Sequence, residues 1–340
     1  MIEKINFAVV GCGHIGKRHA AMIANNPHAE LLAMCDTLNK EALDLSNHPN
    51  VAFYNNLDEM LATEKNLHVV CIATPNGLHA SQALKVLEHN HHVVIEKPMG
   101  LTKTECEDII YKSLQASKQV FCVMQNRYSP PSQWLKTILQ ENLLGEIYMV
   151  QINCYWNRDN RYYKKGNWHG TKALDGGTLF TQFSHFVDIM YWCFGDITNI
   201  HSRIKDFNHQ DMTEFEDSGM ISFDFVQGGI GSIQFSTSVW DKNLESSMTI
   251  IGENGTVKIG GQYMNEVEYC HIKDYEMPVL PPSNPPNDYG QYKGSAANHH
   301  FIIENVVDVL RGNSTITTNA QELTIEGVSR TSIFKKIIGL

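Results

Sequence analysis

A glycine-rich turn near the N-terminus constrains this chain more than any other feature. Gly11, Gly13 and Gly16 follow an apolar run at residues 5–10 and open a segment with helical periodicity. The first glycine permits a tight turn, the second lets the backbone approach a diphosphate, and the third allows a helix to pack closely on a strand. The N-terminus of that helix adds amide donors and a positive dipole. The pattern predicts a dinucleotide-binding β–α–β unit, with cofactor contacts from Gly11, Gly13, His14, Ile15 and Gly16.

The residue that ends the next strand pattern discriminates between dinucleotides. Asp36 lies 20 residues after Gly16. A carboxylate there accepts hydrogen bonds from a ribose 2′-hydroxyl and repels a 2′-phosphate. Residues 37–39 contain no arginine to receive such a phosphate. We therefore expect NAD rather than NADP, and the alternative is a glycine turn of purely structural use.

Strand and helix patterns alternate through the first part of the chain. The strand patterns are short and β-rich, and amphipathic helical patterns lie between them. The expected strands are 5–10, 31–35, 69–73, 92–96 and 120–124, and the expected helices are 16–25, 79–88 and 103–117. This alternation predicts a parallel sheet with right-handed crossovers, which is the doubly wound α/β class known as the Rossmann fold. We place this NAD-binding domain at residues 1–122.

The second half has the pattern of a different domain. Short glycine-containing turns join many of its strand patterns, which is typical of antiparallel pairing. The expected strands are 147–156, 200–207, 218–225, 231–239, 248–251 and 256–259, and the expected helices are 178–194, 296–311 and 319–337. These elements predict an α+β domain with a large, mostly antiparallel sheet. We place this substrate-binding and oligomerisation domain at residues 123–340.

Composition excludes several classes of function. The formal net charge of -10 argues against nucleic-acid binding, which needs a positive surface, but it leaves room for a local basic pocket. Eight cysteines are scattered without a Cys-x-x-Cys pair, and the histidine pairs at 91–92 and 299–300 have no partner at metal-ligand spacing. We expect reduced thiols and no metal. No leader and no bilayer-length apolar stretch is visible, so we expect a cytoplasmic protein without a membrane partner.

Three further motifs carry a resemblance to a known family. They are Ala-Thr-Pro-Asn-Gly-Leu-His at 73–79, Glu-Lys-Pro at 96–98 and Ser-His-Phe-Val-Asp at 184–188, together with His19, which completes Gly-x-Gly-x-x-Gly-x-x-His. The chain resembles the glucose–fructose oxidoreductase / inositol dehydrogenase (Gfo/Idh/MocA) family. Segments at 125–128, 156–158, 168–171, 175–177, 182–185 and 294–299 most resemble its UDP-N-acetyl-glucosaminuronate 3-dehydrogenases. The resemblance implies NAD-dependent oxidation of carbon 3 of UDP-2-acetamido-2-deoxy-glucuronate, in sugar biosynthesis for surface polysaccharides.

The resemblance also implies which residues form the site. The remaining cofactor contacts are Thr74, Pro75, Asn76, His79, Glu96, Lys97, Gln125 and Trp168. The substrate contacts are Asn126, Arg127, Arg158, Tyr163, Gln182, Ser184, His185, Ser295, Asn298 and His299. Capping at loop–helix junctions explains His14 and His79 about as well as cofactor contact does.

Lys97 and His185 are the expected catalytic residues. Oxidation of a carbinol needs a base for the hydroxyl proton while a hydride leaves for the nicotinamide. Lys97 ends a parallel strand, where doubly wound sheets place ligands, and a lysine serves as a base once burial or a cationic neighbour lowers its pKa. His185 is expected to relay the proton or to bind substrate hydroxyls. Many relatives have an aspartate four residues earlier, where this chain has Thr181, and this difference shifts the expected base towards Lys97.

A basic and aromatic segment follows in the predicted second domain. Its cations are Arg127, Arg158, Arg161, Lys164, Lys165 and Lys172, and its rings are Trp156, Tyr162, Tyr163 and Trp168. We expect this segment to recognise a nucleotide sugar, and we expect Arg158→Ala mainly to raise the Michaelis constant. The alternative is a solvated face with an oligomer contact. A sheet with one uncovered face usually finds a partner, so a homodimer or homotetramer is expected.

Three other functions stay open on the sequence. The first keeps the chemistry but acts on a free polyol or monosaccharide such as inositol, and the basic segment favours the nucleotide sugar over it. The second is a catalytically silent, NAD-sensing binding protein, against which the intact Lys97 and His185 argue. The third is a hydrolase that uses NAD transiently, for which no residue argues.

Overall fold

Residues 4–318 are described in the computed structural model of this chain, and their contacts divide them into two units. The first unit contains residues 4–123 and 299–318, and the second contains residues 124–298. The segment 299–318 therefore groups with the N-terminal part, whereas the sequence pattern assigned it to the second domain. The helix predicted at 319–337 lies outside the described residues. Within residues 4–318, no helix has both the length and the apolar character needed to cross a membrane.

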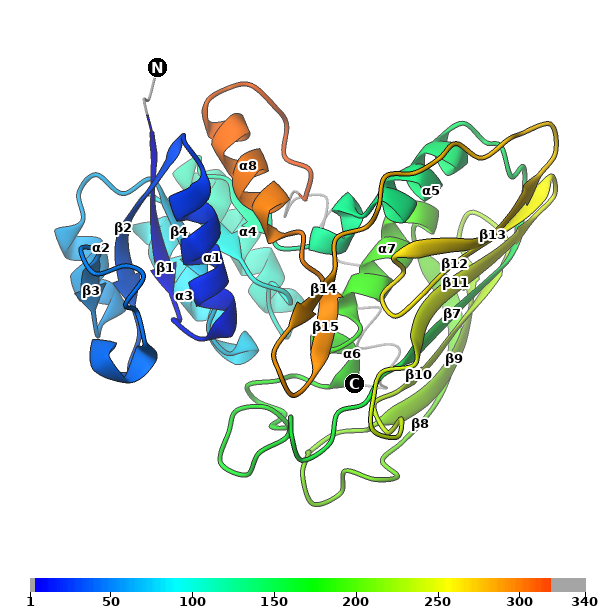
Figure 1. Cartoon of the computed structure of the whole chain (residues 1–340), viewed down its shortest axis with the longest axis horizontal. Helices are drawn as coiled ribbons and strands as arrows, with labels where there is room; N and C mark the ends of the chain where they lie inside the picture. The colour runs from blue at the N-terminus through cyan, green and yellow to red at the C-terminus, as the bar shows by residue number, and fades with distance from the viewer. Residues whose placement is uncertain (1–3, 319–340) are drawn as a thin grey trace. The chain divides into compact units, whose positions relative to one another are not determined.

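The first unit is built on a six-stranded parallel sheet (Figure 1). Its order is β3-β2-β1-β4-β5-β6, and every neighbouring pair is parallel. The strands are β1 (Ile5–Val10), β2 (Ala29–Cys35), β3 (Ala52–Tyr54), β4 (Val69–Ile72), β5 (His92–Ile95) and β6 (Val120–Cys122). The strand order reverses between β1 and β4, and doubly wound sheets bind ligands at the carboxyl ends of the strands beside such a reversal. The predicted Rossmann class is confirmed.

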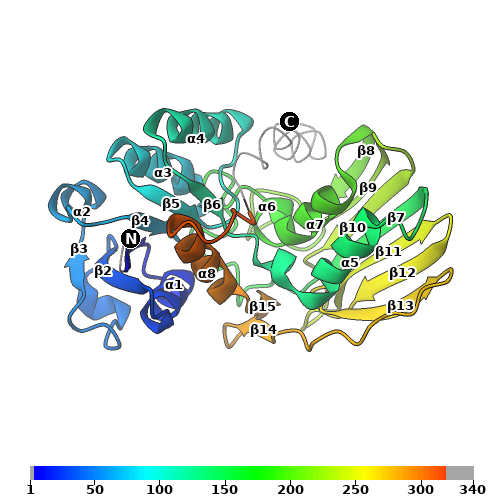
Figure 2. The same ribbon diagram turned by 90° about the horizontal axis from the view of Figure 1, so that it is seen from above.

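Helices cover both faces of this sheet. Helices α1 and α8 pack together, while α3 and α4 form a second pair on the opposite face (Figure 2). The helices are α1 (His14–Asn25), α2 (Leu57–Thr63), α3 (His79–Glu88), α4 (Lys103–Ala116) and α8 (His299–Leu310), with the 3₁₀ turns η1 (Lys40–Leu43) and η2 (Asn76–Leu78). The sequence patterns did not predict β3 or α2. Both elements are short, with three and seven residues, so they carry too few positions for a clear periodicity.

The second unit is built on a seven-stranded sheet with the order β13-β12-β11-β7-β10-β9-β8. The strands are β7 (Ile147–Tyr155), β8 (Ile197–Lys205), β9 (Ser218–Phe225), β10 (Ile230–Ser236), β11 (Glu245–Gly252), β12 (Gly255–Gly260) and β13 (Glu266–Ile272). Strands β7 and β10 pair in parallel, and every other neighbouring pair of this sheet is antiparallel. The predicted mostly antiparallel sheet is confirmed. A small hairpin of β14 (Pro286–Asp288) and β15 (Lys293–Ala296) follows it.

One face of the seven-stranded sheet is covered by helices (Figure 1). They are η3 (Gln125–Tyr128), α5 (Pro130–Gln140), α6 (Thr178–Thr181) and α7 (Ser184–Phe194). The ring of Trp156 packs edge-on against Phe183 and Phe186 under these helices, with centroids 5.5 and 5.6 Å apart. On the other face Met149 pairs with Ile230 and Ile251, and all three side chains are exposed.

The long helix predicted at 178–194 is in fact two helices. α6 ends at Thr181 and α7 begins at Ser184. In the break, the Gln182 side chain accepts a hydrogen bond from Arg158 Nε at 2.6 Å and donates one to the Tyr162 hydroxyl at 2.9 Å. These partners lie some twenty residues away in the chain. Periodicity reports only local spacing, so it could not reveal the break.

Candidate active site

The glycine turn has the geometry that a dinucleotide requires. Gly11 has φ +86°, and a Cβ there would lie 2.6 Å from the Ala73 carbonyl oxygen. A Cβ on Gly16 would lie 1.7 Å from the Gly11 carbonyl oxygen, whereas one on Gly13 would meet nothing within 4 Å. Gly11 and Gly16 are therefore needed for backbone packing, and Gly13 leaves an open approach to the start of α1. His14 is exposed and Ile15 is half-buried beside it.

Asp36 lies beside this turn at the end of β2. Its Oδ2 accepts a hydrogen bond from the Cys12 amide at 2.7 Å, and its Oδ1 accepts one from the Leu38 amide at 2.9 Å. The side chain is half-buried, and each carboxylate oxygen keeps a further lone pair for a ribose hydroxyl. Burial, together with the Asp36 charge, raises the pKa of the Cys12 thiol to about 12. Cys12 is therefore a neutral packing residue and not a nucleophile.

The segment after β4 reaches the same edge of the sheet, because β1, β4 and β5 are parallel neighbours. Thr74 and Pro75 are half-buried there, and Asn76 is buried. The Thr74 hydroxyl donates to Gln82 Oε1 at 2.6 Å. The buried ring of His79 spans two loops, with Nε2 2.8 Å from the Thr74 carbonyl oxygen and Nδ1 2.7 Å from the Pro98 carbonyl oxygen.

Lys97 follows the carboxyl end of β5 and is half-buried, and its peptide bond to Pro98 is cis. Its neighbour Glu96 is buried, with Oε1 2.8 Å from His19 Nε2 and 3.5 Å from His299 Nε2. Burial would raise the pKa of Glu96, but the hydrogen bonds from both imidazoles outweigh it and hold the pKa well below its usual range. Glu96 is thus an ionised carboxylate that its protein neighbours bind.

A polar cluster in the second unit surrounds His185 at the start of α7. Gln125 Nε2 donates to His185 Nε2 at 3.1 Å, so the neutral ring carries its proton on Nδ1. Gln125 Oε1, Asn126 Nδ2 and Ser184 Oγ are buried and have no hydrogen-bond partner among residues 4–318. A buried polar atom without a hydrogen bond lowers the stability of the folded chain by about 1–3 kcal/mol, and a hydrogen bond to a ligand hydroxyl can offset this loss. These three atoms are therefore candidates for ligand contact.

Ser295 and Asn298 fix this cluster from the other end of the unit. The Ser295 hydroxyl donates to Asn126 Oδ1 at 2.6 Å. The Asn298 amide donates to the Gln125 carbonyl oxygen at 3.2 Å and to Ser129 Oγ at 3.1 Å. Both residues hold the backbone and side chains of η3 in place. The next residue along the chain, His299, belongs to the first unit.

The arginines of the basic segment are bound by protein groups. Arg127 is buried and makes a bidentate pair with Asp188, with Nε 2.8 Å from Oδ2 and Nη2 3.0 Å from Oδ1. Arg158 is also buried and donates to Gln182, to the Asn157 and Lys293 carbonyl oxygens and to Asn243. Arg161 is one-third exposed and pairs with Asp159 and Asp241. The exposed cations of the segment are Lys164, Lys165 and Lys172.

The loop between β7 and α6 contains the rest of the segment. Tyr163 is buried and packs edge-on against Tyr162, with centroids 4.9 Å apart, and against Phe215 at 6.3 Å. Trp168 is half-buried and stacks on His169 at 3.9 Å. Lys164 and Lys165 line a hollow of about 670 Å³ in this unit.

Asp175 in this loop has no role that its sequence pattern predicted. Its carboxylate is fully buried, and Oδ2 accepts from the Gly170 amide at 2.8 Å. The Thr181 hydroxyl donates to the carboxylate and, at 2.9 Å, to the Asp175 carbonyl oxygen. Asp175 therefore anchors the loop and the start of the helix pair. The Asp-Gly-Gly at 175–177, in which both glycines have positive φ, was the available sequence signal for a fixed turn.

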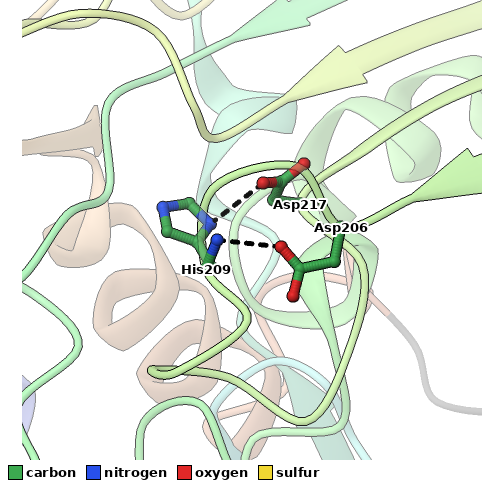
Figure 3. A group of neighbouring side chains, drawn as sticks. All are labelled: Asp206, His209 and Asp217. Atoms are coloured by element: carbon green, nitrogen blue, oxygen red, sulfur yellow. Dashed lines mark hydrogen bonds and ion pairs between the residues drawn. The ribbon is translucent and has the colours of Figure 1, made fainter.

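Asp206, His209 and Asp217 form the one group of potential metal ligands found within residues 4–318 (Figure 3). Asp217 Oδ2 accepts from the Phe207 and Asn208 amides at 3.0 and 2.8 Å, and His209 Nδ1 lies 3.6 Å from it. Asp206 Oδ1 accepts from the His209 amide at 2.8 Å. These contacts close the loop between β8 and β9, and we interpret the group as a loop anchor. The absence of a metal stays a prediction.

The predicted site residues divide between the two units. All the predicted cofactor residues lie in the first unit except Gln125 and Trp168, and all the predicted substrate residues lie in the second unit except His299. In the first unit, the glycine turn, Asp36, the segment 73–79 and Lys97 follow the carboxyl ends of neighbouring parallel strands. An open glycine turn, an acid after β2 and a lysine after β5 in this strand order are the features expected of an NAD-dependent dehydrogenase that acts on a CH–OH group.

The chain belongs to the Gfo/Idh/MocA oxidoreductase family. Residues 5–124 match the model of that oxidoreductase family, described as an NAD-binding Rossmann fold, and residues 132–258 match the GFO/IDH/MocA C-terminal domain. The family membership agrees with the resemblance that the motifs carry, and NAD is the cofactor.

Solved structures and curated proteins show similar chains. The WlbA dehydrogenase of Bordetella pertussis, solved with NADH and UDP-GlcNAcA, is 32% identical with a TM-score of 0.85, covering 98% of this chain and 95% of that one. The WlbA enzyme of Chromobacterium violaceum, solved with the same two ligands, is 30% identical with a TM-score of 0.85, covering 98% and 92%. Inositol 2-dehydrogenase of Salmonella typhimurium is 26% identical over 194 residues, which are 54% of this chain and 53% of that protein.

Proposed function

We propose that this sugar oxidoreductase oxidises carbon 3 of UDP-2-acetamido-2-deoxy-glucuronate. The observation that carries the proposal is the likeness to the two WlbA dehydrogenases, because it extends over 98% of this chain and both were solved with NADH and UDP-GlcNAcA. The proposal includes a role in sugar biosynthesis for surface polysaccharides and a cytoplasmic location. It also assigns NAD binding to the N-terminal domain, and substrate binding and self-association to the C-terminal domain.

Lys97 is the proposed base. Bound NAD supplies the two-electron acceptor. The Lys97 amine removes the proton of the carbon-3 hydroxyl, and in the reverse direction its ammonium returns that proton to the ketone oxygen. The place of Lys97 after β5, on the same sheet edge as the glycine turn, supports this role.

His185 and its neighbours are the proposed sugar contacts. Gln125 Oε1, Asn126 Nδ2 and Ser184 Oγ lack protein partners within residues 4–318 and suit the hydroxyl and acetamido groups of a sugar. The Gln125 hydrogen bond orients the His185 ring, and Nε2 takes up a proton only once that bond is released. Arg127 and Arg158 are engaged by protein groups, which leaves the exposed Lys164 and Lys165 as the proposed cations for the diphosphate.

A second candidate is a dehydrogenase of a free polyol such as inositol. The similarity to inositol 2-dehydrogenase favours it, and that similarity covers about half of each chain. The same Lys97 chemistry serves either substrate. The two candidates differ in whether the diphosphate contributes to binding.

A substrate panel tests the proposal. The protein with NAD is mixed with UDP-GlcNAcA, UDP-GlcNAc, free N-acetylglucosamine or myo-inositol, and NADH absorbance is followed. We expect turnover with UDP-GlcNAcA alone, and product analysis should show a ketone at carbon 3. Because tightly held NADH can stop the reaction after one turnover, a second series adds a 2-oxoacid acceptor. If the protein oxidises myo-inositol and does not oxidise UDP-GlcNAcA, the result contradicts the proposal and favours the second candidate.

Oligomeric state is a separate part of the proposal. The apolar side chains exposed on the uncovered face of the seven-stranded sheet support a homodimer or homotetramer. Sedimentation velocity measures the mass directly, and a monomer at micromolar concentration would contradict this part alone.

A further inference from the structure

Three buried histidines contact the residues on either side of Lys97, and none has a role in the proposed proton transfer. His19 comes from α1, His79 from α3 and His299 from α8, and all belong to the first unit. Their exposed fractions are 0%, 1% and 2%. Burying an imidazole costs desolvation free energy unless it makes specific hydrogen bonds. All three rings make such contacts with the segment 96–98.

Two of the histidines bind the side chain of the residue before Lys97. The Nε2 atoms of His19 and His299 lie 2.8 and 3.5 Å from the same oxygen of Glu96, and the two rings meet edge-on with centroids 5.7 Å apart. The carboxylate thus ties the end of β5 to α1 and α8. The other ionisable groups that face this cluster are Arg18 on α1, Cys71 on β4, His79 on α3 and Lys97.

The third histidine binds the residue after Lys97. His79 Nδ1 lies 2.7 Å from the Pro98 carbonyl oxygen, and Nε2 of the same ring lies 2.8 Å from the Thr74 carbonyl oxygen. A neutral ring carries one N–H, so His79 donates to one of these oxygens and packs against the other, between the loop after β5 and the loop after β4. Lys97 stands between two residues whose positions are fixed by buried rings from three helices.

We propose that His19, His79 and His299 are positioning residues for Lys97. By holding Glu96 and Pro98, they fix the main chain from which the Lys97 amine projects towards its substrate. A base must lie within hydrogen-bond reach of its proton, and a misplacement of about 1 Å costs on the order of 100-fold in rate. This inference rests on the proposed role of Lys97 as the base.

Paired substitutions at His299 and His79 test the proposal. His299→Leu and His79→Leu remove the contacts to Glu96 and Pro98, while His299→Gln and His79→Gln keep one amide donor at each place. At saturating substrate and NAD, we expect the leucine variants to lose at least about tenfold in kcat, and we expect the glutamine variants to regain part of that loss. The matched control is His28→Leu, an exposed histidine of the same unit, which should match the wild type.

A second readout needs no substrate. Acetic anhydride labels free amines, and mass spectrometry compares acetylation of Lys97 with that of the exposed Lys65 in the same digest. In the leucine variants Lys97 should react at least about threefold faster relative to Lys65, because its backbone is no longer held in one place. The glutamine variants should lie between these variants and the wild type.

The two readouts separate this inference from the proposed function. If no sugar is turned over, the labelling still decides on positioning, and the proposed substrate fails by itself. Wild-type labelling of Lys97 in both leucine variants, or wild-type kcat in both, overturns the positioning role. If a leucine variant does not fold, Glu96→Gln keeps the size of the side chain and removes the charge that the two imidazoles bind. Unchanged labelling of Lys97 in that variant also overturns the proposal.

Discussion

Arg127 and Arg158 keep their charges inside the second unit by different means. Arg127 has a carboxylate partner, Asp188, in bidentate geometry. The acceptors around Arg158 are amide and carbonyl oxygens, and the guanidinium also lies 4.8 to 5.3 Å from the ring centroids of Trp156, Tyr162 and Tyr292. Burial lowers the pKa of Arg158, and the neighbouring tyrosines oppose that shift. The substrate-binding role of both arginines stays a prediction, while their structural role follows from these contacts.

Arg158→Met should lower the free energy of unfolding by about 2–4 kcal/mol, because it leaves several buried acceptors without a donor. Urea denaturation measures the change. The control is Arg161→Met, which removes a side chain that is 37% exposed and should lower the free energy of unfolding far less. If both variants lose the same free energy of unfolding, the buried hydrogen bonds of Arg158 do not stabilise the second unit.

Lys97→Met should reduce kcat by about 10²- to 10⁴-fold, because it removes the proposed base while keeping much of the side chain's volume. NADH fluorescence checks that the variant still binds the cofactor. Lys65→Met, at an exposed lysine of the same unit, is the control and should keep full activity. Near-normal turnover by Lys97→Met would remove this residue from the mechanism.

At the scale of elements, two reciprocal glycine–phenylalanine pairs join β9 and β10. Gly231 stands opposite Phe223, and Gly219 stands opposite Phe235. A Cβ on Gly231 would lie 2.2 Å from the Phe223 ring, and one on Gly219 would lie 2.4 Å from the Phe235 ring. Each ring therefore covers the backbone of the opposite glycine. In an ordinary strand glycine is destabilising, but here the missing side chain provides the space for a ring.

Gly231→Ala should lower the free energy of unfolding by about 1–3 kcal/mol, because the new methyl group displaces the Phe223 ring. The control is Ser232→Ala on the same strand, which should change stability by less than about 0.5 kcal/mol. Thermal and urea unfolding both measure the effect. A stabilised Gly231→Ala protein would mean that the ring moves away without cost.

At the scale of the whole molecule, several histidines of the first unit are held neutral. His68 Nδ1 accepts a hydrogen bond from the Asn6 amide, and His92 Nδ1 accepts one from the Gln119 amide, each at 2.9 Å. An imidazole that accepts at Nδ1 loses that bond when it is protonated there. Burial lowers the pKa of His68, His79, His91 and His299, and it lowers the pKa of His92 to about 4.

Acid should therefore destabilise the protein before its carboxylates titrate. Between the unfolded pKa near 6.5 and the lower folded values, the unfolded chain binds more protons than the folded chain, so stability is complete above about pH 6.5 and falls as the pH is lowered. Urea denaturation at steps from about pH 7.5 to about pH 5 measures this slope. His92→Gln should flatten it by about one proton per molecule at most. A stability that is constant over this range would contradict the neutral-histidine interpretation.

Local patterns determined a large part of this protein. The glycine turn, Asp36 and the alternation of strands and helices predicted a parallel doubly wound sheet, and glycine-containing turns predicted the mostly antiparallel second sheet. Both follow from short-range rules, because turn conformation and amphipathic period depend on residues close together in the chain. Strand β9 agrees with its predicted bounds for the same reason. The strand pattern at 92–96 placed Lys97 at the end of a parallel strand from sequence alone.

Only the tertiary structure decided what the buried polar groups do. The sequence named Glu96 and His299 as separate contacts for cofactor and substrate, whereas the folded chain joins them to each other and to His19. The sequence also predicted Arg127 and Arg158 as cations for a ligand, which stays a prediction, and only folding revealed their protein partners. The break between α6 and α7 also follows from partners that are distant in the chain, because Gln182 bonds to Arg158 and Tyr162 there. A polar side chain is satisfied by whichever group lies within about 3 Å, and in these cases that group is far away in the chain.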